Sequence, residues 1–196
     1  MKITLTIIGI LITLLIISQF YFQMAKTETQ PYEILKTEKE YEIRHYPSAT
    51  MATISMNAKT YKELSSSGFR KLASFIFGGN KDDKNIAMTT PVHMDINESQ
   101  SSMSFVMPAN YNKENLPKPN DSAIFITKTE EEHVAAIRFG GYANDDKIKI
   151  YADKLETELN KNGIEYFGNF RFLGYNAPYQ FWGRRNEIIV SVLWNE

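Results

Sequence analysis

The sequence predicts an α+β domain built from two similar ββαββ units. Apolar and polar residues alternate in several short segments, as they do in strands with one buried face. Two longer segments change to the helical period of 3.6 residues, and each is followed by glycine. A shift of about 83 residues superposes apolar segments of the first half on those of the second, Met51–Ile54 on Val134–Ile137 and Phe105–Met107 on Ile188–Val190.

The chain of 196 residues is long enough for one domain with a terminal extension. We expect residues 1–25 to form a membrane anchor or an uncleaved signal, residues 26–31 a linker, and residues 32–196 the folded domain. No charged residue occurs between Lys2 and Lys26, and a segment of that length can span a bilayer. Because it lacks a convincing small-x-small cleavage site, we favour an uncleaved anchor.

The charges around this segment predict its orientation. Lys2 precedes the segment, whereas Lys26 is closely followed by Glu28, so the positive-inside tendency places the N-terminus in the cytoplasm. Residues 20–22 are aromatic and would lie at the far interface. The sequence therefore predicts a single-pass membrane protein with its folded domain on the extracytoplasmic side, or a secreted protein if the segment is cleaved.

The first half of the domain contains five predicted strands and one helix. The helix covers residues 59–77, with Asn57 as the expected cap and Gly78 and Gly79 as the stop. Pro91 cannot donate to a strand ladder, so its strand is expected to be an edge strand or to carry a bulge. The five strands cover residues 32–37, 41–46, 49–56, 85–96 and 103–107.

The second half contains four predicted strands and a second helix. Asn144 caps this helix, its apolar stripe runs from Ile148 to Leu159, and Gly163 ends it. If the halves arose by duplication, their sheets join about a pseudo-two-fold axis and one helix from each covers the outside. A seam of that kind is a common ligand site. The strands cover residues 122–128, 133–139, 167–175 and 187–194.

The composition and the absence of common motifs count against several classes of function. A net charge of -1 and a pI near 6.3 offer no basic surface for nucleic acid. The sequence has no cysteine, so it has no thiol nucleophile and no thiolate metal site. It also lacks the HExxH, GxSxG, Walker A and GxGxxG motifs. We therefore expect neither an enzyme nor a nucleic-acid-binding protein.

The three histidines are the first side chains to consider as ligands. Strand alternation places His45 on the apolar side with Tyr41 and Ile43, where a lone histidine is more commonly a hydrogen-bonded core residue than a ligand. His93 falls on the polar side of its strand. His133 follows three glutamates, which is typical of a surface turn.

The inward stripe of the first helix carries Ser65 and Gly68 among large apolar residues. Small residues on a buried face either leave a hollow for a ligand or allow the helix to approach the sheet closely, and the sequence leaves both open. Lys71 lies at the margin of the stripe, where its long side chain could reach an anionic group.

Six short segments occur in order along the chain: YEIRHYP at 41–47, FRKLASFIFGGN at 69–80, NIAMTTPV at 85–92, FVMPANY at 105–111, LPKP at 116–119 and RRNEI at 184–188. Together they resemble the SOUL haem-binding protein family over nearly everything that follows the predicted anchor. The resemblance implies a distorted antiparallel β-barrel of duplicated halves with two flanking helices. It also implies that the protein binds a tetrapyrrole in an apolar groove near the first helix.

The resemblance further implies which residues hold the ligand. In some members a histidine at the position of His45 is proposed as the axial ligand of haem iron, whereas others hold haem through apolar contacts and basic side chains. A neutral imidazole suits the iron, and lysine or arginine suits the propionates. His45 is therefore the candidate metal ligand, and Phe69, Leu72 and Ile76, with Lys71 at the rim, are the candidate pocket residues.

The leading hypothesis is a membrane-anchored, non-enzymatic carrier, buffer or sensor of haem or another tetrapyrrole. One alternative is a GyrI-like small-molecule-binding domain with hydrolytic activity, because that architecture is also duplicated. Another is a haem-independent interaction module that uses residues 108–119 or the aromatic residues 179–182 as its contact surface.

Overall fold

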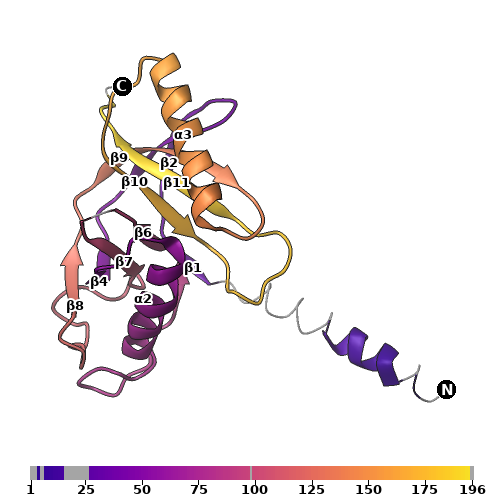
Figure 1. Ribbon diagram of the computed structural model, residues 1–196. Coiled ribbons are helices and arrows are strands. Elements are labelled where there is room, and N and C mark those ends of the chain that lie inside the picture. Colours follow the sequence, from indigo (N-terminus) through magenta and orange to yellow (C-terminus); the bar gives the residue numbers. More distant parts are fainter. Residues whose placement is uncertain (1–3, 5–6, 16–26, 98, 195–196) are drawn as a thin grey trace.

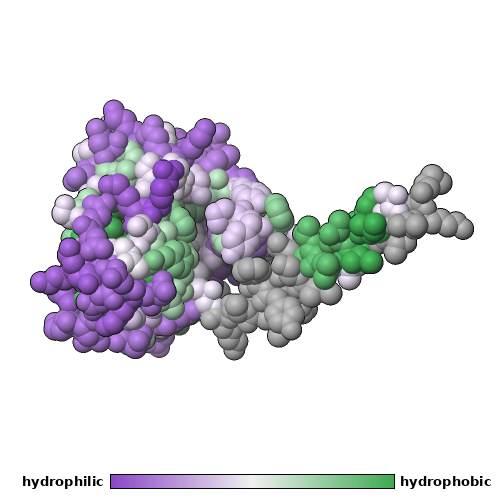
Figure 2. All heavy atoms as spheres, turned by 90° about the horizontal axis from the view of Figure 1, so that it is seen from below, coloured by the Kyte–Doolittle hydropathy of each residue, from purple (hydrophilic) through white to green (hydrophobic). Residues whose placement is uncertain are grey.

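The computed structural model describes residues 4, 7–15, 27–97 and 99–194. Residues 7–15 form an apolar helix that stands away from a mainly hydrophilic domain (Figures 1 and 2). Among the described residues, no helix is both long and apolar enough to cross a membrane. The predicted single-pass membrane location is therefore wrong, while the predicted aromatic belt at residues 20–22 lies outside the described residues.

Every strand and both helices expected after the N-terminal segment are present, with shifted ends. The helices are α2 (Tyr61–Ile76) and α3 (Asp145–Lys161). The strands are β1 (Glu28–Thr29), β2 (Glu33–Thr37), β3 (Glu42–Tyr46), β4 (Thr50–Met56), β5 (Thr89–Thr90), β6 (Val92–Asp95), β7 (Ser101–Val106), β8 (Ile124–Lys128), β9 (Glu132–Phe139), β10 (Tyr166–Gly174) and β11 (Asn186–Val192). The α+β class is thus confirmed.

Nine strands form one antiparallel sheet in the order β2-β3-β9-β11-β10-β6-β7-β4-β8. The end strands β2 and β8 each pair on one side only, so the sheet stays open and the expected barrel is wrong. β1 lies in the predicted linker and pairs in parallel with β5 as a separate two-stranded sheet. The linker is therefore tied to the domain by backbone pairing.

The strand order is symmetric about the junction of β6 and β10. Read outwards from that junction, one side runs β6-β7-β4-β8 and the other β10-β11-β9-β3. This order matches the proposed pseudo-two-fold arrangement, and the duplication itself stays a prediction. The predicted edge position of the strand with Pro91 is wrong, because β6 pairs with both β7 and β10. Pro91 instead separates β5 from β6.

One helix covers each half of the sheet (Figure 1). Helix α2 packs against β4 and β7, and α3 packs against β9, β10 and β11. The Thr60 side chain caps α2 by accepting from the Glu63 N–H, so the expected cap at Asn57 is wrong. The predicted Asn144 cap of α3 is confirmed, since its side chain accepts from the Lys147 N–H. Both helices bury their apolar faces in the same core cluster.

The opposite face of the sheet carries a smaller apolar cluster. It consists of Tyr46, Val134, Ala136, Leu173 and Ile189, with Tyr32 and Tyr175 packed against it. Both faces of the central strands are therefore buried, and polar groups on this second face need partners inside the protein.

Candidate functional site

The predicted pocket residues of α2 lie close together, but two of them are part of the core. Leu72 and Ile76 are 0% and 1% exposed. Phe69 is half buried, and its ring meets Phe105 edge-on at 5.3 Å between centroids. Lys71 is exposed, and its Nζ lies 3.2 Å from an Asp121 carboxylate oxygen. Of the four predicted pocket residues on α2, Phe69 and Lys71 present surface to a ligand without movement of the helix, and the other two do not.

Gly68 decides between the two interpretations of the small residues on α2. A Cβ atom built there would lie 3.3 Å from the Met103 sulfur and 3.4 Å from its Cβ. The glycine therefore allows close approach of α2 to β7, and the predicted hollow is not formed at this point.

His45 lies in the other half of the sheet, on β3. It shares the helix-covered face with the buried Ile43, as strand alternation predicted, but its side chain is 28% exposed. Four strands separate β3 from β7, so the structure does not bring His45 together with the α2 residues. A single macrocycle held by both sets would have to reach across the sheet.

His133 is the direct cross-strand neighbour of His45. The two residues pair in the register of β3 and β9, and their ring centroids lie 5.2 Å apart with the planes tilted by 44°. Glu131 Oε2 is 3.5 Å from His45 Nε2. The prediction of His133 as a turn residue is wrong, because β9 begins one residue before it.

His93 occupies the face that strand alternation predicted, but it is buried there. Its side chain is 8% exposed, and Nε2 lies 2.8 Å from Gln30 Oε1. Burial, with a smaller effect from the charge of Arg171, lowers the pKa of His93 to about 3. His93 is thus a neutral structural residue that joins Gln30, one residue after β1, to β6.

A buried ionic cluster on the second face of the sheet was not expected from the sequence. The Arg44 guanidinium donates to both Glu187 carboxylate oxygens, at 2.7 and 3.1 Å, and Arg185 Nε donates to one of them at 2.9 Å. The Tyr175 hydroxyl donates to Glu187 at 2.9 Å. Burial tends to raise the pKa of Glu187, but the Arg44 and Arg185 guanidinium groups outweigh it and hold that pKa below its usual range.

Tyrosine rings complete the cluster. Arg44 stacks over Tyr32 at 4.3 Å, and Arg185 stacks over Tyr175 at 4.0 Å. Sequence alternation does place Arg44 on the face opposite Ile43. Nothing local in the sequence shows that β11 brings an acid to the same place, since the two residues are 143 positions apart.

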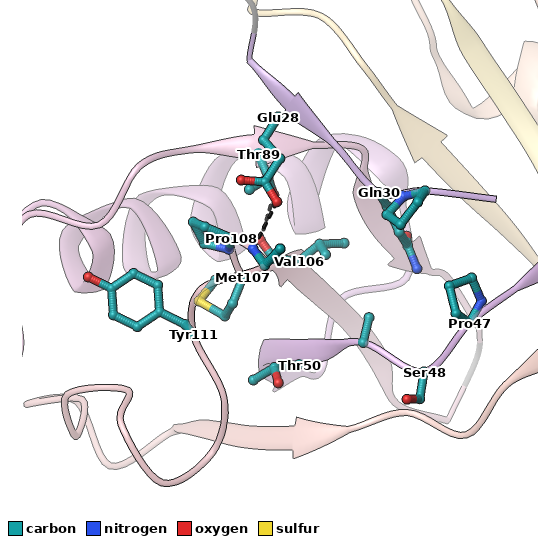
Figure 3. A pocket seen from close by; sticks show the side chains of 13 residues that line it. Glu28, Gln30, Pro47, Ser48, Thr50, Thr89, Val106, Met107, Pro108 and Tyr111 are labelled. Carbon is teal, nitrogen blue, oxygen red and sulfur yellow. Dashed lines mark hydrogen bonds between the residues drawn. The ribbon is translucent and has the colours of Figure 1, made fainter.

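One cavity of about 210 Å³ lies between residues 28–31 and the end of β7 (Figure 3). Pro47 and Ser48 lie on one side of it, and Pro108 and Tyr111 on the other. The Thr89 hydroxyl donates to the Val106 carbonyl along its wall. Pockets for drug-sized ligands span about 300–1,000 Å³, so this cavity is too small to enclose a tetrapyrrole.

A second cavity, of about 300 Å³, lies beside the buried ionic cluster. Its lining includes both Arg44 and Glu187. Acidic and basic side chains balance there, Glu38, Glu40, Glu42 and Glu187 against Lys39, Arg44, Arg138 and Arg185. This balance favours neither an anionic nor a cationic ligand.

The chain is similar to known haem-binding proteins. A family model described as "SOUL heme-binding protein" matches residues 27–191. "Heme-binding protein 1" of Mus musculus is 29% identical over 173 residues, which cover 82% of this chain and 90% of that protein. "Heme-binding protein 2" of Homo sapiens is 29% identical over 156 residues, which cover 76% of each chain.

Two solved structures share the fold at very low identity. The EcmrR C-terminal domain has a TM-score of 0.62 at 9% identity, with 84% of this chain and 99% of that domain covered. A hydrolase from Listeria innocua has a TM-score of 0.57 at 6% identity, with 81% and 94% covered. At such identities the likeness concerns the fold alone.

Proposed function

Because the chain belongs to the SOUL haem-binding protein family, we propose that it binds haem or a related tetrapyrrole and acts as a carrier, buffer or sensor rather than as an enzyme. The observation that carries the proposal is the family match over residues 27–191, which takes in almost the entire sheet and both helices. The hydrolytic and interaction alternatives stay predictions.

We place the iron at His45. A ligand of haem iron must offer an accessible ring nitrogen, and the His45 side chain is 28% exposed. His93 is buried and hydrogen-bonded, and α2 carries no histidine. The cavity of about 210 Å³ is too small for a tetrapyrrole, and the cavity of about 300 Å³ is lined by Arg44 and Glu187 of the second face rather than by His45, so we expect the macrocycle to lie against an open face of the domain.

The competing location is the exposed side of α2. There Phe69 presents part of an aromatic ring, and Arg70 and Lys71 are exposed cations suited to propionates. This location would hold haem without a protein ligand to the iron. Since α2 and β3 lie on different halves of the sheet, the two locations can be tested separately.

The test is a haem titration of the 196-residue chain followed by the haem absorption band. We expect the band to shift at micromolar protein, and His45→Ala to change its position. The matched variant His133→Ala alters the adjacent ring and should leave the band where the wild type has it. If Phe69→Ala weakens binding while His45→Ala has no effect, haem lies on α2 and ligation by His45 is refuted. If the band of the wild type does not move, the function itself is refuted.

A further inference from the structure

His45 and His133 form a pair of which the proposed haem site uses only one member. We propose that the two rings form a clip for a divalent transition-metal ion such as zinc, with Glu131 as a third ligand. The proposal shares His45 with the proposed haem site, but it requires no macrocycle.

The spacing of the two rings suits one shared ion. Two imidazoles that bind one tetrahedral zinc ion through nitrogens at about 2.0–2.1 Å have ring centroids roughly 5 Å apart. The observed separation of the ring centroids is 5.2 Å, and the pairing of β3 with β9 makes the two residues direct cross-strand neighbours. Little change in the sheet is therefore needed for both rings to reach one ion.

The surroundings supply negative charge and access. Glu131 Oε2 already lies 3.5 Å from His45 Nε2, and the Glu131 side chain is 76% exposed. Glu33 is exposed and pairs with His45 from the other side, on β2. The next acid, Glu132, is excluded because both of its carboxylate oxygens bind Arg171.

The third ligand is not yet in place. Within the described part of the chain, no three histidine, aspartate or glutamate side chains lie close enough together to hold a metal ion. The clip thus provides two fixed nitrogens, Glu131 joins them by side-chain rotation, and water completes the four positions. Imidazole with carboxylate is a ligand set that suits zinc, and copper and nickel bind to imidazole as well.

The test is calorimetric titration of the 196-residue chain with zinc chloride at pH 7.5, supported by the visible absorption of bound Co²⁺. We expect one ion per chain. His45→Ala and His133→Ala should each weaken binding by about tenfold or more, because each removes one of the two fixed ligands. Glu131→Gln should weaken it less, and the matched Glu130→Gln, one residue away, should leave it unchanged.

Zinc binding that is unaffected by both histidine variants would overturn the proposal, and so would the absence of binding. The outcomes for the haem proposal are separate. Zinc binding without a haem shift refutes only the haem proposal, whereas a haem shift without zinc binding refutes only the metal clip. If both hold, zinc loaded first should reduce the haem shift, because the two ligands compete for His45.

Discussion

Replacing Glu187 by leucine should strongly destabilise the fold. Glu187 is 0% exposed, and its carboxylate accepts hydrogen bonds from Arg44, Arg185 and Tyr175. Leucine fills a similar volume but leaves the Arg44 guanidinium, only 3% exposed, without its main partner. Glu42, at 2.7 Å from Arg44, remains as a partly exposed second partner.

The expected loss in the free energy of unfolding is about 3–5 kcal/mol, the range found when one member of a buried ion pair is removed. Two features set the value within that range. The remaining Glu42 lowers the loss, because it still pairs with Arg44. Arg185 raises the loss, because it also gives up its ion pair with the Glu187 carboxylate. Replacing both partners, Arg44→Met with Glu187→Leu, should recover much of the loss, because no buried charge is then left without a partner on β3.

Urea unfolding followed by circular dichroism measures these differences. The control is Asp153→Ala, which removes the exposed Lys149 pair on α3 and should leave the unfolding midpoint nearly unchanged. A loss below about 1 kcal/mol for Glu187→Leu would refute the reasoning, since that is the range of an exposed pair. A double variant no more stable than Glu187→Leu would show that burial of Arg44 is not what makes the loss large.

The pH dependence of stability in acid provides a second test of Glu187. The pKa of Glu187 is lower in the folded protein than its usual value of 4.5, so the unfolded chain takes up the proton first. The stabilisation is therefore present above about pH 4.5 and is lost as the pH falls through the lower folded value. Glu187→Gln has no such proton to gain, so its stability should depend less on pH between about pH 5 and pH 3.

Three further predictions concern single positions. His93 has a pKa of about 3 in the fold against 6.5 when unfolded, so the wild type should lose about 2 kcal/mol of stability between pH 7.5 and pH 5, and His93→Gln should lose much less in urea unfolding at the two pH values. Gly68→Leu should cost about 1–3 kcal/mol by overpacking against Met103, whereas Gly68→Ala should be nearly neutral because its helix propensity offsets a tight contact; thermal unfolding of the two variants checks this. Asn144→Ala should lower stability by about 1 kcal/mol by removing the hydrogen bond from the Lys147 N–H, and the Asn144→Ser variant should restore most of it.

Local sequence patterns predicted the elements well, because strand alternation and helical period depend on residues that are close in the chain. The cap at Asn144 follows from the same local patterns. The cap at Thr60 does not, because the predicted helix begins at residue 59 and therefore places Thr60 inside the helix. Closure of the sheet depends on whether β2 meets β8, strands about 90 positions apart, which no local pattern encodes. The barrel came from the family resemblance, and it was wrong for this chain.

The same limit applies to the candidate site: its local features could be predicted from the sequence, and its long-range contacts could not. Alternation correctly placed His45 and His93 on their faces, but burial of His93 depends on Gln30, 63 positions away. The neighbour of His45 is His133, which the sequence places beside three glutamates and the register of β3 with β9 places beside His45. Likewise, Leu72 and Ile76 were recognised as apolar and inward, and only the packing of α2 shows that they are fully enclosed.

The geometry of the histidine pair constrains how haem iron can be bound. Two histidines that serve as axial ligands of one iron must approach it from opposite faces of the macrocycle. His45 and His133 are neighbours on one face of the sheet, with centroids 5.2 Å apart, so the macrocycle cannot lie between them. We therefore expect iron bound to His45 to have one protein ligand and to show the high-spin absorption and resonance Raman signature of such haem. A low-spin bis-histidine spectrum that His133→Ala abolishes would contradict the side-by-side arrangement, and with it the metal clip.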